Sequence, residues 1–155
     1  RIMNKRKTFD YITLKKEPCG IPRTKITSSI VSAEYIRQFY ADDIEIFESM
    51  FILLLNNANM TIGYAKISQG GITGTLVDVK IVCKYALDSL AMGIILAHNH
   101  PSGTLRPSEA DKSITQKVKQ ALDLIDVKIL DHIILAPGTD LFENPYFSFA
   151  DEGIL

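Results

Sequence analysis

Residues 93–111 have the sequence "GIILAHNHPSGTLRPSEAD", and this stretch decides how the chain is expected to fold. "GIILAHNH" is a short apolar run of the kind found in buried central strands of α/β proteins. The segment after it contains proline and glycine and is typical of a loop, whereas "SEAD" opens a stretch with helical spacing of apolar residues. The sequence therefore predicts a buried strand that delivers two histidines to a sheet edge, then a loop and a helix.

The segments around this unit predict further strands and helices. Residues 108–125 have helical spacing, at Ile114, Val118, Ala121, Leu122 and Ile125. Residues 127–137 have the β-rich character of another strand, and "YFSFADEGIL" (146–155) favours a final edge strand. Strands that alternate with helices indicate a layered α/β domain.

The N-terminal half of the domain predicts a helix, a hairpin and a second helix. Ser28 or Ser29 can cap a helix that runs to about Tyr40. Two apolar runs then flank an Asn-rich turn at residues 56–59, which predicts a β-hairpin and so a mixed sheet. Asp78 can cap a helix over residues 79–92, whose predicted apolar face comprises Ile81, Val82, Tyr85, Leu87 and Leu90.

Length and composition suit one compact domain. The chain has 155 residues, 46% of them hydrophobic, and its apolar runs are far shorter than the roughly 20 residues that cross a bilayer. Neither a membrane span nor a secretory signal is expected. The chain has only two cysteines, Cys19 and Cys83, so a disulfide framework is not expected and a cytoplasmic location is favoured. The two are not at C-x-x-C spacing. A zinc site would have to use histidine and carboxylate ligands.

Charge divides the chain into two parts. Residues 1–26 carry eight Lys or Arg and two acidic residues, a net +6, whereas residues 27–155 carry a net −7. We therefore expect a basic arm or linker over residues 1–26 and a folded domain over residues 27–155. A basic arm could bind nucleic acid weakly through its phosphates. The acidic domain argues against broad contact with DNA.

Two histidines, His98 and His100, form a candidate metal site. Residues two apart on a strand point to the same side, so both imidazoles can face one ion. Asp111 lies beyond a turn-rich loop that could return it to the same point. Three protein ligands would leave one position for water, as in a catalytic zinc site. The alternative is structural, because Ser108 and Asp111 fit the S-x-x-[DE] pattern of a capping box at a helix start.

The complete pattern H-x-H-x7-S-x2-D, formed by His98, His100, Ser108 and Asp111, resembles that of the JAMM (MPN+/JAB) metalloprotease superfamily. The stretches "ILAHNHPSGTLRPSEAD", "DVKILDHIIL" and "YFSFADEGIL" resemble its RadC-type branch, over roughly residues 27–155. This resemblance implies a three-layer α/β/α domain with a mixed sheet, related to the cytidine deaminase core. It also implies one zinc ion held by His98, His100 and Asp111, with Ser108 as the active-site serine.

The resemblance further implies an upstream glutamate that acts as general base. Glu48 matches this position, and Glu45 is the rival. The implied reaction is hydrolysis of a peptide, isopeptide or other amide bond in a peptide or protein substrate. Zinc would polarise the carbonyl, Glu48 would move a proton from water to the leaving amine, and Ser108 could donate a hydrogen bond to the oxyanion.

Other functions fit the sequence less well. RadC-type proteins carry a DNA-repair family name, so an accessory module that binds DNA weakly is the alternative. A zinc deaminase needs H-x-E and P-C-x-x-C, and the sequence has neither. The letters "HNH" are contiguous here, whereas HNH nucleases disperse these residues over a ββα unit. His132 lies outside the pattern and is expected to be structural, with support of a metal ligand as its alternative role. Oligomeric state is not indicated.

Overall fold

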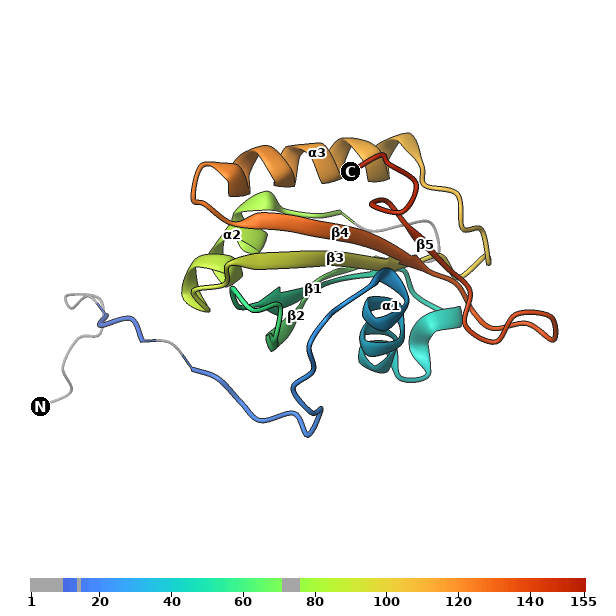
Figure 1. The fold of residues 1–155 in the computed structure, drawn as a ribbon, viewed down its shortest axis with the longest axis horizontal. Coiled ribbons are helices and arrows are strands. Elements are labelled where there is room, and N and C mark those ends of the chain that lie inside the picture. Colours follow the sequence, from blue (N-terminus) through green and yellow to red (C-terminus); the bar gives the residue numbers. More distant parts are fainter. Residues whose placement is uncertain (1–9, 14, 71–75) are drawn as a thin grey trace, which may run out of the picture.

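The computed structural model describes residues 10–13, 15–70 and 76–155. Its centre is a five-stranded sheet with the strand order β2-β1-β3-β4-β5 (Figure 1). The strands are β1 (Ser49–Leu55), β2 (Thr61–Gln69), β3 (Gly93–Asn99), β4 (Lys128–Leu135) and β5 (Tyr146–Ser148). Only β3 and β4 are parallel neighbours, and the other three pairings are antiparallel. The mixed sheet predicted from the sequence is therefore confirmed.

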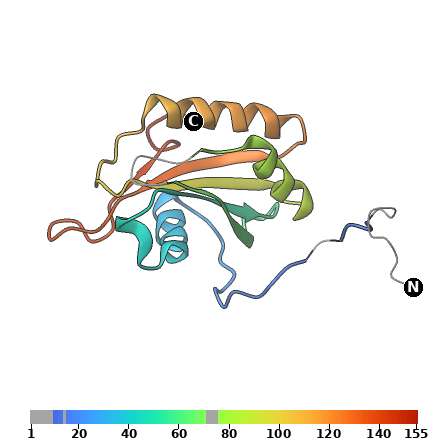
Figure 2. The ribbon, with the colours of Figure 1, turned by 180° about the vertical axis from the view of Figure 1, so that it is seen from behind.

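Helices cover both faces of the sheet. The helices α2 (Val79–Asp88) and α3 (Glu109–Asp123) pack on one face, and α1 (Ser29–Arg37) packs on the other (Figures 1 and 2). Two short 3-10 helices follow α1, over Gln38–Tyr40 and Asp43–Glu45. The fold is the expected three-layer α/β/α arrangement. No helix in the described ranges has the length and apolar character needed to span a bilayer.

The two central strands explain why the sheet holds both layers. Every residue of β1 and β3 is buried, and successive side chains point to opposite faces. Ile52 and Leu96 belong to the core under α2 and α3, whereas Leu53 and Ala97 belong to the core under α1. Continuous apolar runs are what a strand covered on both faces requires.

The hairpin is formed by β1 and β2, and its turn depends on asparagine. The side-chain Oδ1 of Asn56 accepts hydrogen bonds from the backbone N–H groups of Ala58 and Met60. Asn59 has a positive φ of 59°, a conformation that asparagine tolerates better than most residues. The predicted Asn-rich turn is confirmed.

The predicted caps of α1 and α2 are present. Ser28 Oγ accepts a hydrogen bond from Val31 N at the start of α1, and Asp78 Oδ1 accepts one from Lys80 N at the start of α2. The helix predicted to reach about Tyr40 continues past Arg37 as the first 3-10 helix.

The predicted apolar face of α2 is wrong in three of its five residues. Ile81, Leu87 and Leu90 are exposed, and the buried residues are Val82 and Ala86. The buried stripe follows i, i+3 and i+7 from Val79, which the predicted set does not. Leu90 lies beyond the helix end at Asp88 and has a positive φ of 53°, so helical spacing does not apply to it.

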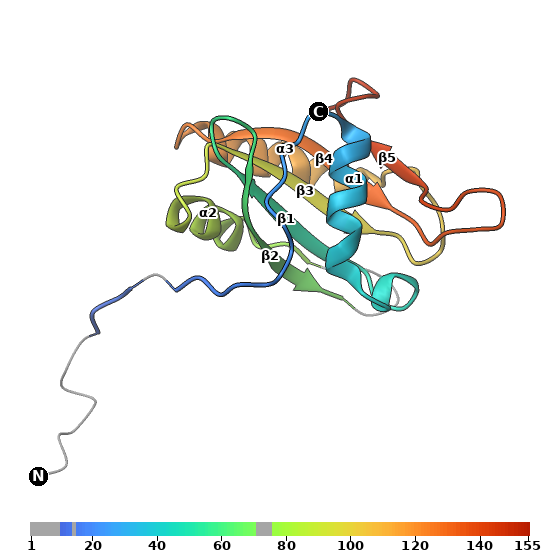
Figure 3. The same ribbon diagram turned by 60° about the horizontal axis from the view of Figure 1, so that its bottom comes forward.

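The chain enters and leaves the domain along the sheet edges. The segment before α1 runs across the β1–β2 hairpin (Figure 3). Lys25 in it pairs with Met60 beside β2, and Ile26 is buried in the core under α1. At the other edge, β5 pairs antiparallel with the end of β4. The predicted C-terminal edge strand is thus present but only three residues long. The C-terminus lies beside α3, where Lys119 Nζ donates to the backbone O of Leu155 (Figure 1).

Candidate metal centre

The two histidines lie at the C-terminal end of β3 and face the same side. His98 is 1% exposed and lies within the strand, and His100 follows directly after its last residue. Their Nε2 atoms are 2.9 Å apart. The alternation of the strand therefore brings two imidazole nitrogens together, as the sequence predicts.

Asp111 reaches the histidines from the first turn of α3. Its Oδ1 lies 3.2 Å from His98 Nε2, and its Oδ2 lies 3.5 Å from His100 Nε2. The same residue completes the capping box, because Ser108 N donates to Asp111 Oδ2 and Asp111 N donates to Ser108 Oγ. Capping and metal ligation are thus compatible, since the box fixes the carboxylate in the direction of the histidines.

Glu48 completes the group from the residue before β1. Its Oε1 lies 3.6 Å from His100 Nε2 and 4.0 Å from His98 Nε2. One ligand atom from each of Glu48, His98, His100 and Asp111 lies within 4.8 Å of the others. Glu45, the rival glutamate, lies in the second 3-10 helix, is exposed and is not part of this group.

Asn99, between the two histidines, holds the segment that carries Glu48. It points to the opposite face of the sheet and is fully buried. Its Oδ1 accepts from Ser49 N, and its Nδ2 donates to the backbone O atoms of Ile44 and Phe47. A buried asparagine needs such partners. Asn99 belongs to no motif in the sequence, although alternation along the strand places it on the opposite face from the histidines.

A buried chain of hydrogen bonds behind His98 determines which of its nitrogens carries the proton. Thr115 Oγ1 lies 2.6 Å from the backbone O of Asp111, which can only accept, so the hydroxyl donates there. The same Oγ1 lies 2.6 Å from His132 Nδ1, which must therefore donate to it. His132 Nε2 then accepts from His98 Nδ1 at 2.7 Å. The Nε2 of a neutral His98 is left with its lone pair, directed at the group.

His132 is thus a partner of a candidate ligand, which was the alternative considered for it. It is fully buried, and its ring stacks on Phe149 with the centroids 4.5 Å apart. Burial holds the pKa of His132 well below its ordinary value. The neutral ring that the hydrogen-bond chain requires is therefore the favoured form. Sequence spacing could not reveal this contact, because it depends on the pairing of β3 with β4.

The loop after His100 fixes the proton of this histidine on Nδ1, as His132 does for His98. Its Nδ1 lies 2.7 Å from the backbone O of Thr104, so Nδ1 carries the proton and donates it. The lone pair of a neutral His100 is then on Nε2, like that of His98. A ligand histidine typically uses its second nitrogen in this way.

The donor set fits a metal ion. With both Nδ1 protons engaged elsewhere, the group offers two imidazole lone pairs and two carboxylates, and only a cation can hold such acceptors together. Ligands about 2.0–2.1 Å from a tetrahedral zinc ion lie about 3.3 Å apart. The two histidine nitrogens lie 2.9 Å apart, and each lies 3.2 or 3.5 Å from an oxygen of Asp111, Oδ1 for His98 and Oδ2 for His100. These separations are close to that spacing, and Glu48 lies slightly farther away.

In the metal-free protein, the close contact between Asp111 and the two histidines shifts the pKa values of His100 and Asp111. The hydrogen bond with Asp111 raises the pKa of His100. Burial acts to raise the pKa of Asp111, but hydrogen bonds from His100 and His98 together outweigh it and hold that pKa far below its ordinary value. A proton can thus occupy the place between these residues that a metal ion would take.

Ser108 lies at the edge of the group as the N-cap of α3. Its Oγ accepts from Asp111 N, and the hydroxyl hydrogen remains available to donate. Capping is the role that its contacts show, and the predicted contact with an oxyanion stays a prediction.

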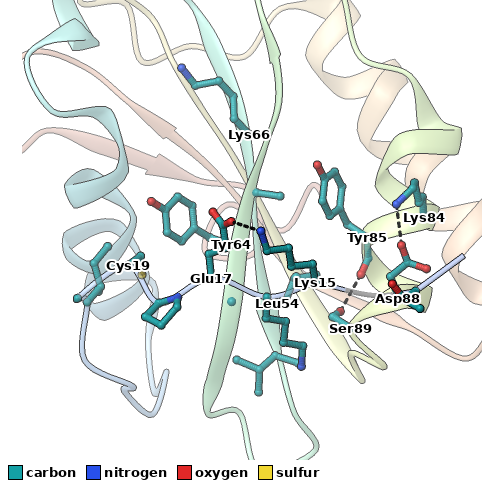
Figure 4. Close-up of a pocket in the computed structure, with 18 of the residues that line it drawn as sticks. Lys15, Glu17, Cys19, Leu54, Tyr64, Lys66, Lys84, Tyr85, Asp88 and Ser89 are labelled. Carbon is teal, nitrogen blue, oxygen red and sulfur yellow. Dashed lines mark hydrogen bonds and ion pairs between the residues drawn. The ribbon is translucent and has the colours of Figure 1, made fainter.

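A larger groove than the space at the metal group lies elsewhere. It has a volume of about 980 Å³ and is lined by residues 15–21 of the arm, by β2 and by α2. Figure 4 shows Tyr64 and Tyr85 beside it, with the Lys15–Glu17 and Lys84–Asp88 ion pairs. None of the four residues of the metal group lines this groove, so the two features are separate.

Comparison with known proteins shows the family of this domain. The family described as the RadC-like JAB domain matches residues 26–154. The chain belongs to this family. A UPF0758 protein of Flavobacterium johnsoniae is 53% identical to this RadC-like domain over 107 residues, which cover 69% of this chain and 44% of that protein.

Two further relatives are similar at lower identity over at least as much of this chain. A UPF0758 protein of Porphyromonas gingivalis is 44% identical over 133 residues, covering 86% of this chain and 56% of that protein. The UPF0758 protein YfjY of Escherichia coli is 43% identical over 108 residues, covering 70% and 64%. The RadC-like domain thus spans about half the length of the first two relatives.

Proposed function

We propose that this RadC-like JAB domain is a zinc-dependent hydrolase that cleaves an amide bond of a peptide or protein substrate, either a peptide or an isopeptide bond. The observation that carries the proposal is the group of four acceptors at the end of β3, in which both histidines direct lone pairs to one place. Histidine nitrogen and carboxylate oxygen are ligands that zinc accepts.

In this proposal His98, His100 and Asp111 hold the zinc ion, and Glu48 stays free for proton transfer. A bound zinc ion would supply a lowered pKa for water and polarisation of the substrate carbonyl. Glu48 lies farther from the histidine nitrogens than Asp111 does, at 3.6 and 4.0 Å against 3.5 and 3.2 Å, which favours a base over a fourth ligand. It would take a proton from the attacking water and deliver it to the leaving amine.

Asn99 and Tyr40 would keep the base in place. Asn99 binds the backbone on either side of Glu48, at Phe47 and Ser49, and the Tyr40 hydroxyl donates to the backbone O of Ser49. Ser108, with its free hydroxyl hydrogen, would donate a hydrogen bond to the oxygen that gains charge in the transition state.

Metal analysis and activity together test the proposal. We expect about one zinc per chain in the wild-type protein, with zinc lost in His98→Ala and in Asp111→Ala. Glu48→Gln should keep the zinc and lower kcat by about 10²- to 10⁴-fold toward a panel of peptides and isopeptides. Glu45→Gln is the matched control and should change neither zinc content nor rate. A zinc-loaded wild-type protein that cleaves nothing in the panel would contradict the proposal.

A further inference from the structure

A small cavity opens directly beside the candidate metal centre. It has a volume of about 200 Å³, and one side of it is formed by Glu48, His98 and Asp111. It lies on the α3 face of the sheet, where β1 and β3 run side by side with Met50 opposite His98. A group held in this cavity would therefore be adjacent to whatever binds at the metal.

The other sides of the cavity are apolar. Met50 follows Glu48 by two residues and so shares its face of the sheet, while Ala110 and Ile114 lie one turn apart on α3. Val77 closes the cavity from the segment before α2, and Leu76 at its rim is 92% exposed.

We propose that this cavity binds an aliphatic side chain of the substrate residue next to the bond that is cleaved. The inference rests on the proposed hydrolase function and adds a substrate class to it. The domain would prefer residues of leucine or methionine size at one position flanking the cleaved amide.

Size and chemistry both favour this occupant. A cavity of about 150 Å³ with apolar walls can hold a benzene molecule, so one of about 200 Å³ accepts a side chain of leucine or methionine size. None of the described residues that line it is lysine or arginine, so a carboxylate or phosphate group would find no cationic partner there. An aliphatic group would gain from leaving water for Met50, Val77 and Ile114.

Alkyl hydroxamates of increasing length test the cavity without relying on turnover. The hydroxamate group chelates zinc, and its alkyl chain can extend into the neighbouring space. On zinc-loaded protein, calorimetry should show affinity rising about fourfold per methylene from acetohydroxamate to pentanohydroxamate, as expected from about 0.8 kcal/mol per buried CH₂.

Filling the cavity should remove this length dependence. Ala110 is exposed in the first turn of α3, so Ala110→Leu adds bulk to the cavity without disturbing the core. We expect this variant to bind acetohydroxamate normally and to show a flat series. Gln120→Leu places the same side chain at an exposed position later in α3 and should behave like the wild type.

The outcomes separate the two proposals. A flat series in the wild-type protein, or an unchanged slope in Ala110→Leu, would overturn the cavity proposal and leave the hydrolase proposal standing. Zinc-loaded protein that binds no hydroxamate would overturn both, because no ligand position would then be open at the metal. If a peptide library is cleaved, enrichment of Leu, Ile or Met at one flanking position supports the cavity, and cleavage without such enrichment contradicts it.

Discussion

Three consecutive residues, His98, Asn99 and His100, contribute two different functions because a strand alternates its faces. The histidines face α3 and the candidate metal position. Asn99 faces α1 and forms hydrogen bonds with the backbone of the segment before β1. Each histidine has its second nitrogen engaged, one with His132 and the other with a backbone carbonyl. Whether the two histidines can bind a metal ion therefore depends on their protons staying on Nδ1.

Which nitrogen of His98 carries the proton depends on the hydroxyl of Thr115, through His132. Thr115→Val removes the acceptor of the His132 Nδ1 proton, which can then move to Nε2 and force the His98 proton onto the nitrogen that faces the metal. We expect zinc affinity to fall about 10- to 100-fold, measured by competition with a chelator. Thr115→Ser keeps the hydroxyl and should keep the affinity. Equal affinities in the two variants would show that this hydrogen-bond chain does not control His98.

Protons and zinc compete at His100, and this sets a pH dependence. Its pKa is raised by Asp111, so in the metal-free protein the protonated ring stabilises the fold below the unfolded value of about 6.5. That stabilisation is lost as pH rises through the raised folded value. Zinc displaces this proton, so the increase in Tm on adding zinc should grow as pH rises through the same window. A gain in Tm that stays constant from about pH 5.5 to about pH 8.5 would contradict this.

The first turn of α3 combines a helix start with a metal ligand. The capping box of Ser108 and Asp111 satisfies backbone N–H groups, and the positive end of the helix dipole favours the Asp111 carboxylate. The loop after β3 returns the chain over the sheet edge, with His100 N bonded to the backbone O of Leu135. An element boundary therefore positions a functional side chain more rigidly than a loop would.

Two substitutions of Ser108 separate its capping role from a role in catalysis. Ser108→Ala should lower the free energy of unfolding by about 1 kcal/mol, whereas Ser108→Gly should lower it by only a few tenths. If the hydroxyl binds the oxyanion, both variants should lose about 10²- to 10³-fold in kcat, independent of that stability difference. Unfolding curves and kcat for both variants provide the measurement. Full activity in Ser108→Gly would show that Ser108 only caps α3 and does not act in catalysis.

At the scale of the whole molecule, the site is assembled by strand order. Glu48 precedes β1, the histidines end β3, and Asp111 begins α3. They meet because β1 runs antiparallel beside β3, which brings the start of one strand to the end of the other. His132 and Thr115 join them through β4 and α3.

The basic arm remains the candidate for weak contact with nucleic acid. Residues 23–26 hydrogen-bond to the hairpin, as in the bonds from Thr61 N to Thr24 O and from Ile26 N to Asn59 O. A deletion should therefore stop at residue 22, which removes six of the eight basic residues of the arm. We expect this deletion to abolish any salt-dependent binding of duplex DNA, measured by fluorescence anisotropy at low and high salt. Undiminished binding by the shortened protein would place the contact on the acidic domain instead.

Local patterns in the sequence predict most of the fold. Apolar runs, asparagine at the turn and Ser or Asp at helix starts are signals that neighbouring residues carry by themselves, and they predicted the helices, the hairpin and the mixed sheet. The histidine pair and the capping residues were visible for the same reason. The buried face of α2 could not be predicted in this way. The helix ends at Asp88, and spacing alone does not indicate which stripe of residues faces the sheet.

The sequence by itself thus determined most of the elements and three candidate metal ligands, His98, His100 and Asp111, and it left Glu48 and Glu45 as alternatives for the base. Only the tertiary structure decided that Glu48 rather than Glu45 lies at the site, and that Asn99 holds the segment which carries it. It alone placed His132 and Thr115 behind His98 and opened an apolar cavity beside the group. These features depend on strand order and register, which join residues far apart in the chain, and periodicity along one segment does not specify such contacts.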